Sequence, residues 1–172
     1  LRRVTEEALD GNEALLFPVK DALAYIERTR LGGWDGRGVQ GASFYNAKNP
    51  PFGATFTYYL KEKLRTKKEL RHKAEKDAYK ADETPAYPSI EDLRAESEER
   101  TPEVILTVRD DSGSVIRVVR GERDKGMHRA VWDLRYPGYE PIELASGDKL
   151  PWEFPNSGPL VAPGTYSVTL SK

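Results

Sequence analysis

Few residues in this sequence have a type and spacing suited to binding or catalysis. The first candidate is a glycine-rich segment. Residues Gly36–Gly41 read G-x-G-x-x-G. This pattern binds a dinucleotide when a strand precedes it and a helix follows it, because the helix N-terminus then meets the pyrophosphate. Here the chain soon reaches Pro50 and Pro51, which cannot belong to such a helix. We therefore expect a flexible linker and no nucleotide site.

The two histidines, His72 and His128, are the next candidates for catalysis or metal binding. His72 lies between Arg71 and Lys73, where we expect it to be solvated, and His128 lies near the start of an alternating stretch. No His-x-x-x-His or EF-hand spacing is present, and the chain has no cysteine, so neither a metal site nor a Cys nucleophile is indicated. The sequence predicts no catalytic residue, no cofactor and no metal ligand.

Acidic residues offer two further possibilities. Asp110 and Asp111 could hold a cation, but together with Ser112 and Gly113 they fit a turn better. Two carboxylates across a cleft could hydrolyse a glycoside. Most acidic residues, however, fall in a charged stretch where we expect them to be exposed, with ordinary pKa values. We therefore expect that this chain is not an enzyme.

Aromatic residues in a proline-rich loop carry one binding alternative. Tyr136, Tyr139 and Trp152 lie in this loop, with Phe154 close by. Exposed rings could stack on sugars, whereas rings packed against a sheet would fix the loop in place. The exposure of Tyr139 and Trp152 distinguishes the two interpretations.

Composition limits the class of protein. The chain has 172 residues, with 27 Lys and Arg against 28 Asp and Glu, and a net charge of −1. This balance argues against a general nucleic-acid or anionic-membrane binder, and no apolar run is long enough to span a bilayer. Charged residues make up 32%, so we expect a solvated segment outside the core. Residues Leu1–Glu7 show neither an initiator Met nor a signal-peptide pattern, and we expect a processed or excised piece of a longer protein.

Alternating apolar residues predict a mainly β protein. Residues 103–120 predict a β-hairpin around a turn at Asp110–Gly113, and further alternation is found at 54–60, 130–134 and 165–170. Several short strands separated by turns favour an antiparallel β-sandwich. The side chains that share an apolar face are Phe56, Tyr58, Leu60, Val104, Leu106, Val108, Ala130, Trp132, Leu134, Tyr166, Val168 and Leu170.

A charged insertion interrupts this pattern over residues 61–100. Lys61–Lys80 contains nine basic and four acidic residues, whereas Asp82–Glu103 contains eight acidic and two basic residues. Good helix formers dominate the first half, and Ser89 is a typical N-cap for the second. We expect two helices of opposite charge that project from the sandwich as a solvated hairpin.

The N-terminal segment, residues 1–41, is too apolar for a free tail. Its apolar residues fit neither one amphipathic helix nor one strand, and glycines interrupt its end. We expect an irregular docking segment that contacts a partner or a missing domain, while residues 42–172 form the sandwich. Because aromatic anchors dominate such interfaces, we predict Phe17, Tyr25 and Trp34 as partner-binding residues.

Several motifs resemble known families. The turn at Asp110–Gly113, the segment from Gly126 to Trp132-Asp133, and the Pro163-Gly164-Thr165-Tyr166 strand resemble the Ig-like module of the flagellar hook-cap protein. The stretches FPVKDALAY, NPPFGATFTYYLKE and VWDLRYPG resemble the region that follows a sortilin-like, BNR-repeat β-propeller in exported bacterial proteins, often labelled glycosyl hydrolases. This second resemblance covers nearly the whole chain. It implies an Ig-like or fibronectin-III-like sandwich in an extracytoplasmic setting: periplasmic, cell-surface or secreted.

The resemblance does not extend to catalysis. The chain contains no Asp-box repeat, so no chemistry of a propeller can be assigned to any residue here. We therefore predict a non-catalytic structural or interaction module, either the C-terminal part of a larger exported propeller protein or a subunit of an assembly. Its partner would be a protein or the missing propeller. The alternative is a carbohydrate-binding module accessory to a glycoside hydrolase, with Tyr136, Tyr139 and Trp152 as stacking residues.

Overall fold

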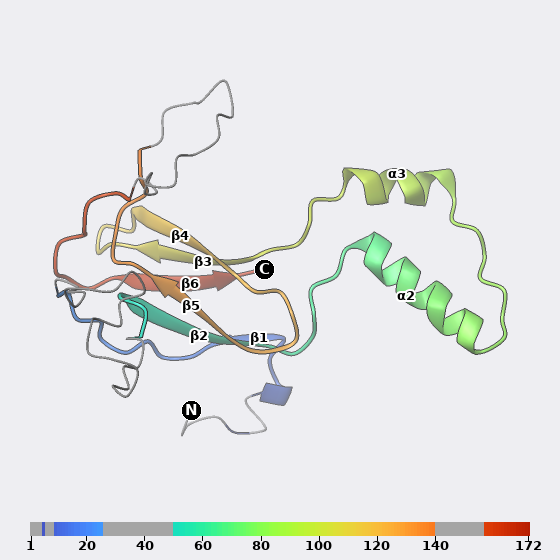
Figure 1. Ribbon diagram of the computed structural model, residues 1–172, viewed down its shortest axis with the longest axis horizontal. Coiled ribbons are helices and arrows are strands. Elements are labelled where there is room, and N and C mark those ends of the chain that lie inside the picture. The colour runs from blue at the N-terminus through green and yellow to red at the C-terminus, as the bar shows by residue number, and fades with distance from the viewer. Residues whose placement is uncertain (1–4, 6–8, 26–49, 140–156) are drawn as a thin grey trace, which may run out of the picture.

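The computed structural model describes residues 5, 9–25, 50–139 and 157–172 of the chain. Six strands and two helices lie within these residues (Figure 1). In chain order they are β1 (Ala14–Leu16), β2 (Ala54–Leu60), α2 (Lys67–Lys80), α3 (Ile90–Glu98), β3 (Val104–Arg109), β4 (Val115–Gly121), β5 (Gly126–Trp132) and β6 (Ser167–Ser171). The prediction of a mainly β chain is confirmed.

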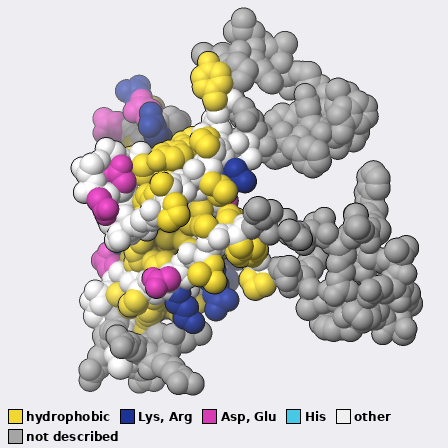
Figure 2. Space-filling model, turned by 90° about the vertical axis from the view of Figure 1, so that its left-hand side faces the viewer, with side chains coloured by type: hydrophobic (Ala, Val, Ile, Leu, Met, Phe, Trp, Pro, Cys, Tyr) yellow, Lys and Arg dark blue, Asp and Glu magenta, His cyan; other side chains and the backbone are white. Residues whose placement is uncertain are grey.

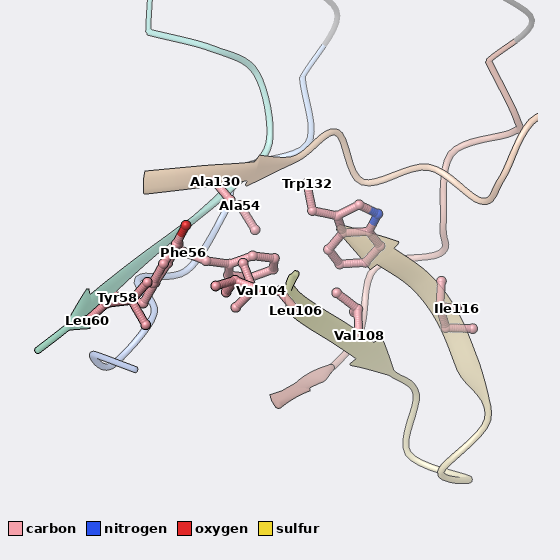
Figure 3. Packing of buried hydrophobic residues seen from close by; sticks show 10 residues of the cluster. All are labelled: Ala54, Phe56, Tyr58, Leu60, Val104, Leu106, Val108, Ile116, Ala130 and Trp132. Atoms are coloured by element: carbon pink, nitrogen blue, oxygen red, sulfur yellow. The ribbon is translucent and has the colours of Figure 1, made fainter. Parts of the chain in front are cut away.

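The strands form two antiparallel sheets of three strands each, in the orders β1-β2-β5 and β4-β3-β6. The chain changes sheet between β2 and β3, between β4 and β5, and between β5 and β6. Alternate side chains of the two central strands, β2 and β3, meet in one core between the sheets (Figure 3). The two sheets therefore pack as a sandwich, in which each buries its apolar face against the other.

The core confirms the alternation seen in the sequence. In β2, β3 and β5, every residue assigned to an apolar face is buried. Leu134 just after β5, and Tyr166, Val168 and Leu170 near the C-terminus, are only partly buried. The buried members are Ala54, Phe56, Tyr58, Leu60, Val104, Leu106, Val108, Ile116, Ala130 and Trp132.

Trp132 joins the two sheets at one end of the core. Its side chain is 3% exposed, and its indole N–H donates to the backbone C=O of Arg135 at 3.0 Å. The ring packs edge-on against Tyr166, with 5.3 Å between the ring centroids. The burial leaves no polar atom of the indole without a partner. The prediction that Trp132 is a core residue is confirmed.

Tyr58 is a buried aromatic residue with a polar end, and a glycine makes room for it. Its hydroxyl donates to the backbone C=O of Glu122 at 2.8 Å, and burial raises the pKa of Tyr58, so the hydroxyl remains a neutral donor. A Cβ atom on Gly121 would lie 2.4 Å from the Tyr58 hydroxyl oxygen. The glycine at the end of β4 is therefore required by packing.

The insertion contains two helices that project away from the sheets (Figure 1). Thr66 caps α2, because its side chain accepts from the N–H of Glu69 while the Glu69 carboxylate accepts from the N–H of Thr66. Ser89 caps α3, as predicted. Neither helix has a buried residue. The helices are therefore held by caps and surface ion pairs rather than by a core of their own.

Arg71 links the two helices. Its guanidinium donates to both carboxylate oxygens of Glu96 in α3, at 2.6 and 2.9 Å, and this contact lowers the pKa of Glu96. A second ion pair, between Glu69 and Arg123 at 3.0 Å, ties α2 to the connection between β4 and β5. These ion pairs thus join the two helices to each other and to the sandwich through charged side chains.

The helical insertion is shorter than predicted. The N–H of Lys61 donates to the C=O of Glu13 at 2.9 Å, and the N–H of Leu64 donates to the C=O of Arg123 at 3.0 Å. The Leu64 side chain also packs against the core. Residues 61–66 therefore extend the sandwich, although their charged composition resembles that of the helix that follows. The expected insertion at 61–100 is corrected to helices at 67–80 and 90–98.

Replacing residues 67–99 with a flexible Gly/Ser linker is expected to leave the sandwich folded. The two helices contribute no residue to the core, and the partly exposed Glu69–Arg123 pair stabilises little. The urea midpoint followed by far-UV circular dichroism should change little. Replacement of residues 61–100 is the matched comparison, and its midpoint should fall further because Leu64 is lost from the core. Equal damage from both replacements would show that the helices support the sheets.

The N-terminal segment is not irregular throughout. In β1, Ala14 lies opposite Leu60 and Leu16 lies opposite Tyr58, and the N–H of Phe17 donates to the C=O of Thr57 at 3.0 Å. The prediction of an irregular segment over 1–41 is therefore wrong at Ala14–Leu16, which form one edge of the first sheet. A strand of three residues is too short for alternation to be recognised in the sequence. The sandwich accordingly includes residues before 42.

Candidate interaction surface

A groove at the end of the sandwich away from the helices is the candidate site. One wall is the segment 19–24, which follows β1, and the other is the loop 160–166, which leads into β6. Both walls lie at the same end of the molecule (Figure 1), and Trp132 and Leu134 line the groove between them. The groove has a volume of about 570 Å³, within the range of binding pockets.

Backbone hydrogen bonds hold the loop wall in place. Arg135 and Leu160 form an isolated antiparallel bridge, and the N–H of Val161 donates to the C=O of Leu134 at 2.8 Å. The Arg135 guanidinium also donates to the C=O of Gly158 at 2.9 Å. Gly158 is buried, and a Cβ atom there would lie 2.3 Å from the C=O oxygen of Tyr136. This wall is therefore fixed by the end of β5 and not only by its own turns.

Large apolar side chains are exposed along the groove. Leu23 is 78% exposed, Leu160 is 47% exposed and Tyr25, just beyond the groove, is 50% exposed. Figure 2 shows hydrophobic side chains gathered across this end of the molecule. Ala22 and Val161 beneath them pack against the core. Apolar side chains that gather on a surface in this way mark interaction sites.

A second hollow lies along the other side of the same segment. It has a volume of about 380 Å³, and Phe17, Lys20 and Asp21 line it together with Thr57 and Arg129 from the outer face of the first sheet. Lys20 and Asp21 line both hollows. The segment after β1 thus presents an apolar groove on one side and a polar hollow on the other.

The predicted partner-binding residues can be placed in part. Phe17 is half-buried and lines the polar hollow. Tyr25 packs edge-on against Phe52, with 5.1 Å between the ring centroids, and keeps half of its surface exposed. Trp34 lies outside the described residues. The structure therefore places Phe17 and Tyr25 at opposite ends of one surface segment.

The sequence did not identify the loop wall of the groove. Leu160 and Val161 lie in a proline-rich stretch without periodicity, so no pattern distinguished them from other loop residues. Leu23 lies in the N-terminal segment, whose apolar residues show no single period either. The two walls meet because the fold of the two sheets brings residues that are far apart in the chain to one end of the sandwich.

The predicted sugar-stacking residues are also placed in part. Tyr136 is 38% exposed, and its C=O accepts from Arg117 at 3.2 Å. Tyr139 is 83% exposed. Trp152 and Phe154 lie outside the described residues. The exposure of both tyrosines leaves the carbohydrate alternative open.

Two of the titratable residues singled out in the sequence, Asp110 and His128, have structural partners. Asp110 accepts from the N–H groups of Ser112 and Ser114, both at 2.9 Å, and its contacts, chiefly with the Ser112 hydroxyl, lower its pKa. His128 lies 5.4 Å from Tyr58 between ring centroids, and its Nε2 is 2.6 Å from the C=O oxygen of Asp124. The interpretation of Asp110 as a turn residue is confirmed.

Neither a metal cluster nor a membrane-spanning helix is found in the described part of the chain. No group of three or more His, Asp or Glu side chains there could hold a metal ion. Neither described helix has the length and apolar composition that would cross a bilayer.

The chain was also compared with known proteins. No protein family, no curated protein and no solved structure matches it.

Proposed function

We propose that this chain is a non-catalytic interaction module that docks onto another protein domain through the apolar groove between residues 19–24 and 160–166. The observation that carries this proposal is the exposure of Leu23 and Leu160 on the two walls of the groove. Docking would remove these side chains from water and stabilise the complex by the hydrophobic effect.

An Ig-like or fibronectin-III-like sandwich is the fold type that we propose for this module. The order of strands supports it: β1, β2 and β5 share one sheet, and β3 lies beside β6 in the other. An immunoglobulin sandwich likewise places its first, second and fifth strands in one sheet and its third and sixth strands in the other.

The proposed partner is a sortilin-like β-propeller domain in an exported protein, either in the same polypeptide or in the same assembly. The sequence resemblance supports this choice. Two stretches of this resemblance, FPVKDALAY at 17–25 and VWDL at 131–134, contribute residues to the groove. PGTY at 163–166, which carries the resemblance to the Ig-like module, contributes residues as well. The stretches that carry the resemblances therefore meet at this end of the sandwich, where we place the docking surface.

Hydrogen–deuterium exchange with and without a BNR-repeat propeller domain tests the proposal. Protection is expected in residues 19–25 and 160–166. Leu23→Asp and Leu160→Asp should each weaken the complex by about tenfold or more, because a charge would be buried where an apolar anchor lay. Val118→Asp is the matched control: Val118 is 51% exposed on β4, outside the groove, and its replacement should leave binding unchanged.

Two outcomes would contradict docking at the groove. One is protection confined to the helices α2 and α3. The other is equal loss of binding in Val118→Asp and Leu23→Asp. Circular dichroism of each variant separates a binding defect from unfolding.

A carbohydrate-binding module remains the second candidate, because Tyr139 and Tyr136 are both exposed. Calorimetric titration with soluble glucans and chitooligosaccharides tests it. Binding that disappears in Tyr139→Ala and persists in Leu23→Asp would favour this function over docking.

A further inference from the structure

The polar hollow on the outer face of the first sheet differs in chemistry from the docking groove. Its volume of about 380 Å³ is within the range of pockets that bind small molecules. Its lining combines two cations, Lys20 and Arg129, with one carboxylate, Asp21, and two hydroxyls, those of Thr55 and Thr57. Two positive charges against one negative charge give the lining a net charge of +1.

Strand pairing places several of these groups in one row across the sheet. Thr57 in β2 lies directly opposite Arg129 in β5, and Thr55 lies two residues along β2 on the same face. On its other side, the C=O of Thr57 accepts from the N–H of Phe17 at 3.0 Å. Thr57 therefore lies between Arg129 at one end of the row and the half-buried Phe17 at the other.

The charged groups of the hollow have no partner among the described residues. Lys20, Asp21 and Arg129 are exposed, and no hydrogen bond or ion pair joins their side chains to another described residue. Arg71 and Arg123, by contrast, each pair with a glutamate. The charges of the hollow are therefore available to a ligand.

We propose that this hollow binds a sugar acid, a ligand of monosaccharide size with one carboxylate and several hydroxyls. The guanidinium of Arg129 offers a planar pair of donors that matches a carboxylate, and Lys20 adds a second positive charge. The two threonines and Asp21 can bond the hydroxyls, while the ring of Phe17 supplies an apolar surface for the C–H groups. The negative charge of Asp21 disfavours a dianion such as inorganic phosphate.

Titration of the isotope-labelled chain with sodium glucuronate, followed by NMR chemical shifts, tests this proposal. Saturable shifts are expected at the amides of Lys20, Thr57 and Arg129. Glucose, which lacks the carboxylate, and sodium chloride at matched ionic strength should give none. Arg129→Gln should weaken binding by about tenfold or more, because it removes the charged donors. Arg129→Lys keeps the charge without the fork and should fall between the two.

Matched variants locate the site. Arg120→Gln removes an arginine from β4, in the other sheet and outside the hollow, and should bind glucuronate as the wild type does. Tyr139→Ala and Leu23→Asp should also bind it normally, because neither residue lines the hollow. Since Leu23 lines the docking groove, failure of docking and failure of sugar-acid binding are distinguishable.

Several results would overturn the proposal. One is the absence of saturable shifts up to about 50 mM glucuronate, where any binding would be too weak to indicate a site. Equal binding of glucose would show that the carboxylate is not recognised, and equal or tighter binding of inorganic phosphate would show general attraction of anions. Equal loss of binding in Arg129→Gln and Arg120→Gln, or loss in Tyr139→Ala, would place binding elsewhere.

Discussion

Trp132→Ala is expected to lower the free energy of unfolding by about 3–5 kcal/mol. The side chain is 3% exposed and fills the space between the end of β5 and Tyr166, so truncation leaves a cavity that the two sheets cannot easily close. The hydrogen bond from the indole N–H to the C=O of Arg135 is lost as well. Urea denaturation followed by far-UV circular dichroism measures the change, because this signal does not depend on the tryptophan itself.

Two variants control for this effect. Trp132→Phe keeps an aromatic ring against Tyr166 and should cost clearly less than alanine. Met127→Ala lies on the same strand but on its outer face, where the side chain is 42% exposed, and should change stability by less than about 1 kcal/mol. If Met127→Ala were the more damaging change, the assignment of the inner and outer faces of β5 would be wrong, because a shift of one residue exchanges the faces.

Gly53→Ala should destabilise the chain by about 3 kcal/mol or more. A Cβ atom at this position would lie 1.9 Å from the C=O oxygen of Trp132, and the φ angle of +123° is one that only glycine adopts without strain. The added methyl group must therefore push β2 away from the end of β5, in addition to straining its own backbone. Thermal or urea unfolding of the variant measures the loss.

Gly113→Ala separates these two contributions. Gly113 also has a positive φ angle, +83°, but a Cβ atom there meets nothing within 4 Å. Its replacement should cost only the backbone strain, about 1–2 kcal/mol. Equal effects at Gly53 and Gly113 would mean that the contact with Trp132 is relieved by a small movement and that strain alone determines the cost.

Sequence patterns predicted the strands that bury one face, for a physical reason. In β2, residues 56, 58 and 60 are apolar because every second side chain enters the core, and the same rule places Leu106 in β3 and Trp132 in β5. The N-cap at Ser89 was also recognisable, because local hydrogen bonding alone determines it. The capping box of Thr66 and Glu69 has an equally local signal but was not identified.

Features that depend on distant parts of the chain could not be predicted in this way. β1 is a strand because β2 pairs with it, and its own three residues carry no period. The groove exists because the segment after β1 and the loop before β6 meet at the end of β5. Neither wall has a sequence pattern that predicts its contact with the other wall. Trp34 and Trp152 lie outside the described residues, so their roles in partner and sugar binding remain predictions.

The order of strands also has a consequence for the rate of folding. Among the described strands, β3 and β4 are joined by a short turn, whereas the pairs β1–β2, β2–β5 and β3–β6 each join residues separated by long connections. Folds dominated by such non-local pairing fold slowly, because loop-closure entropy is lost before the contacts form. The β3–β4 hairpin is then the natural first structure. Shortening the connection from β2 to β3, whose helices contribute no residue to the core, should speed refolding while the native core stays the same.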